Sequence, residues 1–332
     1  MYYLGIDVAK AKLDCALLDT QTQKRKVKVV QNTPEGFAAL QAWIRAQHIT
    51  LTDVHVIIEP TGTYHERAAL ALHEAGCIVA LVNPAKARSY ANGVVGVRSK
   101  TDTTDAALLA RYGAAEHPAA WQPPPPSARA LQALLTRRNA INEDLQREQN
   151  RLEKYQALDV AQTPSLVMKS LQESIVFLTN QSKALQREIN DHINSDPDLK
   201  QKYTLLQTIP GVGERVAEQM TALLVAHRFT RAEQLAAYLG LVPVEWQSGS
   251  SIKGRPHLSK AGPAHLRKLL YMPAVVATKC NPHISAMYKR LLANGKSKMS
   301  AMGAAMRKLA HLCFGVIHTG KPYNATLGLK NS

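Results

Sequence analysis

The order of strand-like and helix-like segments near the start of the chain is the feature that most limits its fold. Three short segments of β-branched and apolar residues come first, joined by short polar turns, and this is the pattern of consecutive strands. Helical and strand patterns then alternate. Strands are expected at residues 2–9, 13–19, 25–31, 53–59 and 77–83, and helices at about 34–47, at about 63–75 and on to about 115. This order predicts an α/β domain over residues 1–120, in which helices pack on a mixed sheet.

A run of four prolines, residues 123–126, ends this predicted domain. Consecutive prolines form a stiff extended spacer, and Ser127 is expected to cap the helix that follows. We interpret residues 121–200 as this linker and a pair of long helices. Residues 201–332 are then a third, mostly α-helical domain.

The long helices are indicated by apolar residues that recur every three or four positions, interrupted only by Arg138 and Glu148 and by a break at Thr163 and Pro164. The apolar series is Leu131, Leu134, Ile141, Leu145, Leu152 and Tyr155, then Leu171, Ile175, Leu178, Leu185 and Ile189. This pattern predicts an antiparallel hairpin, a coiled coil between protomers, or both. A helical pair packed within one globular domain is the alternative.

The charge of the chain is distributed very unevenly. The net charge is +16, and residues 201–332 contain 18 lysines and arginines against four acids. No acid follows Glu245, so the last 87 residues are purely basic. An acid-free segment with interleaved tyrosine, histidine and methionine favours a polyanionic partner, and we expect nucleic acid.

The composition is that of a cytoplasmic globular protein. Hydrophobic residues make up 45% of the chain, no apolar run is long enough to span a membrane, and the N-terminus lacks the pattern of a secretion signal. The four cysteines, Cys15, Cys77, Cys280 and Cys313, are widely separated. They match no zinc or disulfide pattern, so we expect reduced packing residues and no membrane partner.

Two aspartates three residues apart, Asp102 and Asp105, begin a helical pattern that Thr101 can cap. This spacing places both carboxylates on one helical face. Acids in a first turn favour the helix dipole, which explains either aspartate alone. The alternative is a divalent-metal site, because a hard cation such as Mg²⁺ prefers oxygen ligands and makes close carboxylates favourable. That alternative requires further acids from elsewhere in the chain.

Asp7 in "GIDVAK" and Glu59 in "VIIEPTGTY" supply such acids, each at the end of an expected strand. Functional groups cluster at strand ends in open sheets. One acid on the first strand, one on the fourth and two on a helix beside them is the arrangement of the ribonuclease-H-like nuclease fold. Four converging carboxylates could bind two Mg²⁺ ions, which clamp a phosphodiester and stabilise its attacking and leaving oxygens.

Several segments together resemble one family. "GIDVAK", "IEPTGTY" and "KTDTTDA", with "IPGVGERVA" and "EWQSGSSIKGRPHLSKAGPAHLRKLLY", are similar to the signature segments of the DEDD-type transposases of bacterial insertion sequences, the insertion sequence 110 family. These are related to the Piv site-specific DNA invertases. The resemblance implies a RuvC-like first domain in which Asp7, Glu59, Asp102 and Asp105 bind Mg²⁺, with Mn²⁺ as the alternative ion.

The segment "TIPGVGERVA", residues 208–217, places Gly211 and Gly213 at a tight turn between helices. A helix-hairpin-helix turn presents backbone N–H groups to a DNA phosphate without sequence preference. An ordinary glycine turn is the alternative. The nucleic-acid contacts that we expect are Gly211, Gly213, Lys253, Arg255, Lys260, Arg267 and Lys268.

Three serines, Ser248, Ser250 and Ser251, lie in "WQSGSSIKGR". By itself such a stretch is most simply a flexible capped loop. The family resemblance implies a serine nucleophile in this segment, and matching the motif places it at Ser248, with Gln247 where some relatives carry an acid. A serine hydroxyl needs activation, here by the metal cluster or by Lys253, so the site would combine two domains of one or of different protomers.

The resemblance also implies the partners. They are donor and target DNA, a structured bridge RNA that pairs with both, and further copies of the chain, as a dimer that assembles to a tetramer. The protein would act on nucleoid DNA in the bacterial cytoplasm. Delegating sequence choice to base pairing agrees with the lack of an obvious sequence-reading DNA module.

Three functions compete on the sequence. The first is a metal-dependent recombinase that uses a serine nucleophile. The second is a hydrolytic junction-resolving nuclease, in which the acids cut and Ser248 only caps a loop. The third is a nucleic-acid-binding protein whose acids are structural, and four acids on the appropriate elements argue against it.

Overall fold

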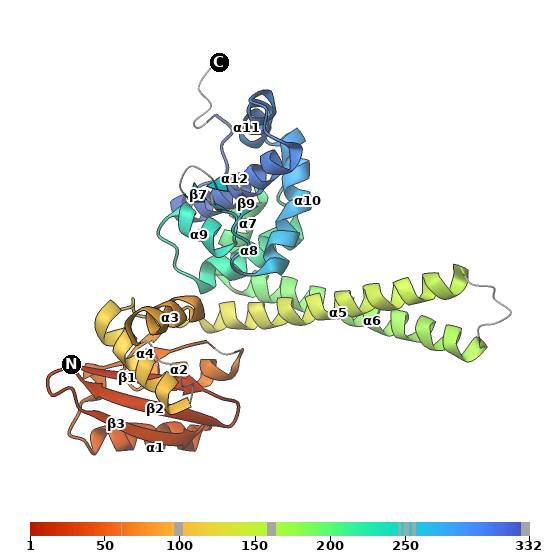
Figure 1. The fold of residues 1–332 in the computed structure, drawn as a ribbon. Helices are drawn as coiled ribbons and strands as arrows, with labels where there is room; N and C mark the ends of the chain where they lie inside the picture. The colour runs from red at the N-terminus through yellow and green to blue at the C-terminus, as the bar shows by residue number, and fades with distance from the viewer. Residues whose placement is uncertain are drawn as a thin grey trace. The chain divides into compact units, whose positions relative to one another are not determined.

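The computed structural model describes residues 1–60, 62–95, 102–157, 164–244, 247–248, 252–253 and 257–326, with the side chains at 94–95, 102–103, 247–248 and 252–253 left out. The chain folds as two compact units, Met1–Pro123 and Pro124–Ser332 (Figure 1).

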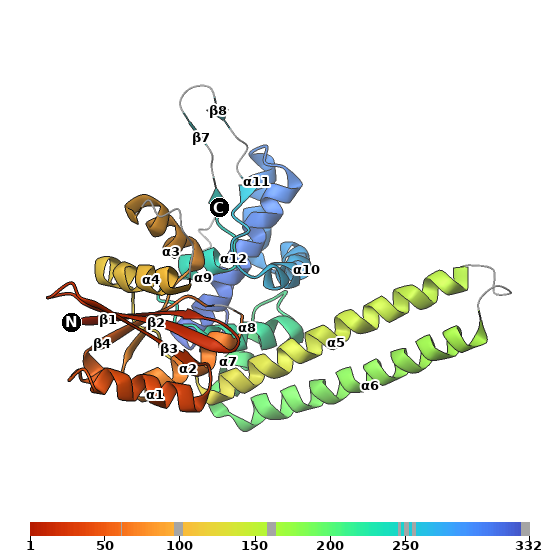
Figure 2. The same cartoon turned by 60° about the horizontal axis from the view of Figure 1, so that its bottom comes forward.

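The first unit is built on a five-stranded mixed sheet of order β3-β2-β1-β4-β5 (Figure 2). Its strands are β1 (Tyr2–Val8), β2 (Lys12–Asp19), β3 (Arg25–Gln31), β4 (Val54–Ile58) and β5 (Ile78–Leu81). The first three pair antiparallel, whereas β4 is parallel to β1 and β5 is parallel to β4. The predicted mixed sheet and all five strands are confirmed.

Helices cover both faces of this sheet. On one face, α1 (Pro34–Arg45) and α2 (Tyr64–Glu74) pack on the inward side chains of the strands, including Leu4, Ile6 and Val56. Pro34 is the first residue of α1, and the Thr33 side chain caps it by accepting from the Gly36 amide (3.3 Å). On the other face, α4 (Asp102–Glu116) packs against β1 and β2.

Two shorter pieces complete the unit. A 3₁₀ turn, Leu51–Asp53, leads into β4. Helix α3 (Pro84–Tyr90) begins where the Asn83 side chain accepts from the Ala85 amide (2.8 Å), and it continues as a π-helical turn over Ala91–Val95.

The second unit begins with the two long helices, α5 (Pro126–Ala157) and α6 (Ser165–Ser195), which lie side by side as an antiparallel hairpin (Figures 1 and 2). The predicted seam faces inward, with Leu131, Ile141 and Ile189 buried. The expected cap at Ser127 is wrong. Because Pro126 already occupies the first helical position, Ser127 lies inside the helix, and its carbonyl oxygen accepts from Nε2 of His192 (2.8 Å).

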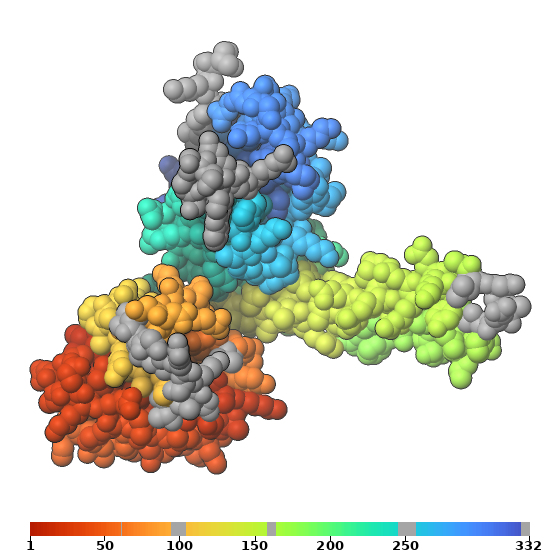
Figure 3. All heavy atoms as spheres, in the orientation of Figure 1, coloured from red at the N-terminus to blue at the C-terminus, as the bar shows by residue number. Residues whose placement is uncertain are grey.

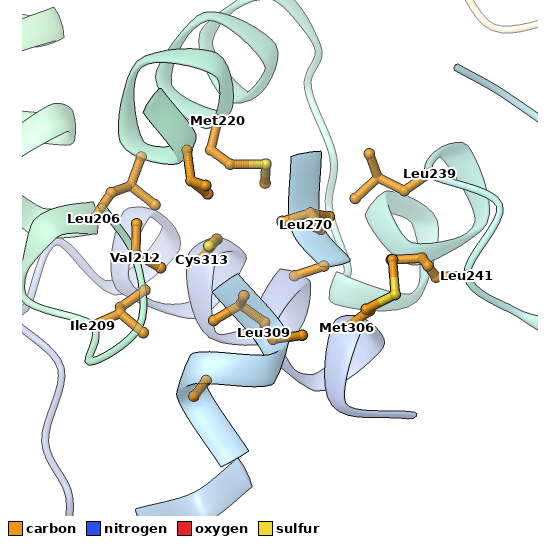
Figure 4. Packing of buried hydrophobic residues seen from close by; sticks show 14 of the residues in the cluster. Leu206, Ile209, Val212, Met220, Leu239, Leu241, Leu270, Met306, Leu309 and Cys313 are labelled. Atoms are coloured by element: carbon orange, nitrogen blue, oxygen red, sulfur yellow. The ribbon is translucent and has the colours of Figure 1, made fainter. Parts of the chain in front are cut away.

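A helical bundle forms the rest of this unit. Its helices are α7 (Pro197–Gln207), α8 (Glu214–Ala226), α9 (Ala232–Tyr238), α10 (Ala264–Cys280), α11 (Pro282–Ala293) and α12 (Lys298–Thr319). Leu206, Met220, Leu270, Leu309 and Cys313 meet in its core (Figure 4). The expected helical C-terminal region is therefore confirmed.

The cysteines are all free. Cys15, Cys77 and Cys313 are buried packing residues, as expected, and burial raises the pKa of the Cys77 thiol to about 11 and that of Cys313 to about 12. Cys280, at the end of α10, is exposed, so the packing role expected of it is wrong. Throughout the described ranges, no helix combines the length and the apolar character needed to cross a membrane.

Candidate active site

Asp7 and Glu59 lie level with each other at one edge of the sheet. Strands β1 and β4 run parallel, and Ile6 is in register with Ile58, so the next residue on each strand carries one of the two acids. Neighbouring strands are about 4.8 Å apart. Both acids are half-buried. The structure therefore brings the backbones of these two predicted site residues together at the carboxyl ends of β1 and β4.

Helix α4 runs antiparallel to β1, and glycines reveal its direction. A Cβ atom on Gly5 would lie 2.0 Å from the carbonyl oxygen of Ala106, so the helix backbone rests directly on the strand. Farther along α4, a Cβ atom on Gly113 would lie 2.9 Å from Cδ1 of Tyr3. As β1 runs from Tyr3 to Gly5, α4 therefore runs backwards from Gly113 to Ala106.

This direction places the first turn of α4 toward the carboxyl end of β1. Asp102 is the first residue of the helix and Asp105 the fourth, so both lie toward the edge that carries Asp7. Alternation along β1 puts Asp7 on the same face as Gly5, which is the face that α4 covers. Thr101, the expected cap, lies outside the described residues.

The described side chains do not form a closed ligand set. No three His, Cys, Asp or Glu side chains in the described part of the chain are grouped closely enough to hold a metal ion. The side chain of Asp102 is not among those described, whereas Asp105 is half-buried. The structure thus gathers the four backbone positions at one edge, and the metal-ligand role of the four acids remains a prediction.

Sequence reasoning missed Asp14 and Asn32 at this edge. Asp14 pairs with Asp7 across the β1–β2 ladder, is only 5% exposed, and accepts an ion pair from Nζ of Lys12 (3.0 Å). Asn32 donates from Nδ2 to the carbonyl oxygens of Ala9 (3.0 Å) and Tyr64 (3.1 Å), so it joins the turn after β1 to the start of α2. An acid within the apolar run "LDCALLD" was the available signal for Asp14.

His65 stands in the first turn of α2, shortly after Glu59. Its side chain is buried, and Nδ1 has no hydrogen-bond partner among the residues that the structure describes. Burial lowers the pKa of this imidazole, because the charged form loses its hydration. The neutral form is therefore favoured beside the acid edge.

The predicted serine segment contains one short antiparallel ladder and is flanked by the two strands of another, both in the second unit. Strand β6 (Pro243–Val244) pairs with β9 (His257–Leu258), and within that span β7 (Gln247–Ser248) pairs with β8 (Ile252–Lys253). Figure 2 shows β7 beside β8. The register sets Ser248 opposite Ile252. The side chains of Ser248 and Lys253, and the whole of Ser250, Ser251 and Arg255, lie outside the described residues.

The glycine turn between α7 and α8 is partly a packing device. Gly211 has φ of 98°, and a Cβ atom there would lie 2.8 Å from Cβ of Ala277 on α10, so both its conformation and its contact require glycine. Gly213 precedes α8 at the N-cap, and a Cβ atom there would have no described atom within 4 Å. Glu214 is exposed in the first helical turn, where its charge opposes a phosphate. Phosphate binding by this turn remains a prediction.

The expected basic contacts differ in their surroundings. Arg267 donates from Nη1 to the carbonyl oxygens of Gly262 (3.0 Å) and Leu239 (3.3 Å), so it holds the turn before α10. Lys260, with φ of 53°, and Lys268 are exposed. Arg267 thus has a structural contact that the sequence did not predict, while the two lysines are open to solvent.

Comparison with known proteins identifies the family. Residues 4–160 match a model of DEDD-type IS110 proteins described as "Transposase", and residues 203–289 match "Transposase IS116/IS110/IS902 family". The chain is 35% identical over 324 residues to the pilin gene-inverting protein of Moraxella bovis, which covers 97% of each chain. The chain belongs to the IS110 transposase family. It is therefore a DNA-cleaving recombinase enzyme.

Two further proteins are similar to this chain. The pilin gene-inverting protein of Moraxella lacunata is 34% identical, again over 97% of each chain. An uncharacterized 43.6 kDa protein of insertion element IS110 from Streptomyces coelicolor is 29% identical over 169 residues, which is 50% of this chain and 40% of that protein. As an IS110-family transposase, the chain binds DNA, and membership implies use of a divalent metal ion.

Proposed function

We propose that this IS110-family transposase cuts and rejoins the DNA of an insertion sequence and its target, with the acid edge of the first unit and Ser248 acting in one reaction. The observation that carries the proposal is the parallel register of β1 and β4. It sets Asp7 and Glu59 level, while α4 packs on Gly5 with its first turn toward the same edge. The strand order β3-β2-β1-β4-β5 supports a ribonuclease-H-like, RuvC-like assignment of this unit.

The acids at this edge suit a hard divalent cation, because every proposed donor is a carboxylate oxygen. Asp7, Glu59, Asp102 and Asp105 would hold Mg²⁺, or Mn²⁺ in its place. When bound, the ion would supply positive charge that stabilises the phosphodiester during cleavage. Four carboxylates brought together at this edge would repel one another, and a bound cation would offset that repulsion.

Ser248 would provide the covalent step. Its Oγ forms a bond to phosphorus as the bond from phosphorus to the 3′ oxygen breaks; the serine proton is released, and the departing 3′ oxygen takes one up. The 5′ phosphate then remains on the serine, and a 3′ hydroxyl from another end can reverse the step without ATP. Lys253, which is in register with Gln247, the residue before Ser248, would stabilise the charge that develops on the phosphate.

A bridge RNA would select the DNA by base pairing. What supports this is the acid-free basic segment that follows Glu245 and the family membership. Protein isolated from its host should carry RNA transcribed from the DNA that flanks its gene. Sequencing the bound RNA and DNA tests this, and recovery of DNA alone, with full recombination after ribonuclease treatment, would remove the RNA from the account.

The hairpin of α5 and α6 would join copies of the chain into a dimer that assembles to a tetramer. Its sides carry large apolar residues that are open to solvent, including Val176 (60% exposed) and Phe177 (61% exposed) on α6. Figure 3 shows one face of this hairpin in yellow and green. Adjacent exposed apolar side chains on a long helix favour contact with another protein surface.

Inversion of a DNA segment is a second candidate outcome of the same chemistry. The full-length similarity to two pilin gene-inverting proteins favours it. In cells that carry the gene with its flanking DNA, polymerase chain reaction across the flanks distinguishes excised or inserted junctions from inverted ones. If only inverted junctions are detected, the reaction of this protein is inversion and not transposition.

Ser248→Ala tests the recombinase against a hydrolytic nuclease. The substrate is a plasmid that carries the gene with its flanking DNA, supplied with RNA transcribed from those flanks and with Mg²⁺. We expect no strand cleavage by Ser248→Ala and normal cleavage by the control Ser251→Ala. Cleavage that survives Ser248→Ala would favour the hydrolytic nuclease instead.

A further inference from the structure

The hairpin of β1 and β2 places a lysine and a second acid beside Asp7. Asp14 is in register with Asp7, and alternation along β2 puts it on the face of Ala16, which packs against Ala106 and Ala107 of α4. Asp7 faces the same helix, so the two carboxylates lie side by side on one face of the sheet. Like charges directly opposite each other across a ladder are destabilising.

Lys12 offsets this charge. Its Nζ lies 3.0 Å from Oδ2 of Asp14, and the Asp14 side chain is only 7% exposed. A buried carboxylate needs such a partner, because burial removes its hydration. The charge of Asp14 is thereby compensated within the hairpin.

The position of Lys12 points to a further role for its ammonium group. The residue closes the turn between β1 and β2, where the Ala9 amide donates to the Lys12 carbonyl oxygen (3.0 Å), so it lies at the carboxyl end of β1. Alternation with Asp14 puts its side chain on the face that α4 covers. The Lys12 side chain is 45% exposed, whereas Asp14 beneath it is buried. The ion pair with buried Asp14 thus holds the ammonium group at the edge that carries Asp7 and Glu59.

We propose that Lys12 binds a non-bridging phosphate oxygen of the DNA strand at the acid edge, and that Asp14 is a positioning residue that holds the ammonium group there. A lysine ammonium is a compact charge with three donors, suited to a phosphate oxygen. Its contact with buried Asp14 restricts the flexible side chain before DNA arrives, so less order is lost on binding. The inference rests on the proposed function, because it places the phosphate at the acid edge.

Lys12→Met is the direct test, with Lys10→Met as the matched control. Lys10 lies in the same turn and is exposed, and its substitution removes the same charge. Strand cleavage of the flanking-DNA plasmid is measured with RNA and Mg²⁺ under single-turnover conditions, alongside DNA affinity by gel shift. For Lys12→Met we expect the cleavage rate to fall about 10–100-fold with DNA affinity changed less than about threefold, because many other basic residues bind the DNA. Lys10→Met should cleave at the wild-type rate.

Two further variants separate a phosphate contact from a purely structural ion pair. Asp14→Asn should slow cleavage less than Lys12→Met does, and Lys12→Arg should restore part of the rate. If Lys12→Met does not fold because Asp14 is left unpaired, the rate is taken from Lys12→Met with Asp14→Asn, which removes both charges.

The outcomes distinguish this inference from the proposed function. Wild-type cleavage by a folded Lys12→Met protein, or by the double variant, while Asp7→Asn is inactive, would overturn the role of Lys12 and leave the acid edge in place. Wild-type cleavage by Asp7→Asn would overturn the proposed function itself.

Discussion

Charged residues interrupt apolar patterns in two regions of the molecule, and they do so with opposite consequences. At the sheet edge, Asp14 and Lys12 form a pair whose lysine remains half-exposed beside Asp7. In the second unit, Arg138 of α5 and Glu218 of α8 form an ion pair of 2.6 Å with side chains 3% and 1% exposed.

Gln186 of α6 completes the second network by donating from Nε2 to Oε1 of Glu218 (2.7 Å) and by accepting from Arg138. Three helices therefore meet at one buried ion pair, with the partly buried Gln186 beside it. An edge pair that reaches solvent can meet a substrate, whereas an ion pair buried between helices can only hold them together. We infer that charges at the sheet edge affect the reaction and that the Arg138–Glu218 pair affects stability.

The largest expected effect is on catalysis at the sheet edge. Asp7→Asn, and likewise Ala at Asp7, Glu59, Asp102 or Asp105, should lower the cleavage rate by more than about a thousandfold, or at least about 4 kcal/mol in the barrier. The melting temperature without metal should stay near that of the wild type, because removing one carboxylate relieves repulsion.

The control for these variants is Asp53→Asn, which removes an exposed acid away from the edge. Mg²⁺ should raise the melting temperature of the wild type and of Asp53→Asn, since a ligand that binds only the native state stabilises it. A site variant that recombines DNA at the normal rate would show that its residue is not a ligand.

Arg138→Met should lower the stability of the fold, whereas the variants at the sheet edge should lower the cleavage rate. It leaves the Glu218 carboxylate buried without its cation, and breaking such a pair costs about 3–5 kcal/mol of stability. Chemical denaturation followed by circular dichroism measures the loss. Arg138→Met combined with Glu218→Leu should recover most of it, because both charges are gone. A single variant as stable as the wild type would contradict the structural role of the pair.

Gly5→Ala should have a smaller effect, which sharpens the assignment of α4 to the acid edge. The added Cβ would meet the carbonyl oxygen of Ala106 at 2.0 Å, so α4 has to shift. Overpacking of this kind costs about 1–3 kcal/mol. We expect lower stability together with slower cleavage by the protein that remains folded. Gly315→Ala, whose added Cβ would have no described atom within 4 Å, is the comparison for added bulk. Unchanged cleavage by Gly5→Ala would mean that the position of α4 does not set the site.

The smallest effect on stability is expected on the outer side of the hairpin. Replacing Val176 and Phe177 by Ser should change stability by no more than about 0.5 kcal/mol each, because both are exposed. It should lower the oligomeric mass measured by light scattering. Leu145 and Leu152 are poorer probes, since they are half-buried within the hairpin and Asp there would disturb α5 itself. An unchanged mass would remove this surface from the assembly.

Local patterns predicted the elements well, because strands and helices differ in apolar period. Strand β3 occupies the expected residues, and α1 ends within two residues of its expected end. The predicted helix cap at Ser127 was wrong because proline is itself favoured at a first helical position. The helix therefore begins one residue earlier, at Pro126.

Contacts between distant segments could not be predicted in the same way. In the sequence, Arg138 only interrupts an apolar pattern. Its ion pair could not be predicted, because the partner Glu218 lies 80 positions away on another helix. The sequence placed Asp7 and Glu59 at strand ends, yet only the register of β1 with β4 sets them level. Asp14 was missed because its relation to Asp7 depends on the pairing of β1 with β2.

The most direct test of one reaction shared by the acid edge and Ser248 is to trap the covalent intermediate. The protein is incubated with end-labelled flanking DNA, RNA transcribed from the same flanks and Mg²⁺, then denatured, and the DNA-linked peptide is identified by mass spectrometry. We predict an adduct on Ser248 for the wild type and none for Asp7→Asn. The claim that the acid edge and Ser248 act in one reaction would be contradicted by any of three results: cleavage without an adduct, an adduct on Ser250 or Ser251, or an undiminished adduct in Asp7→Asn.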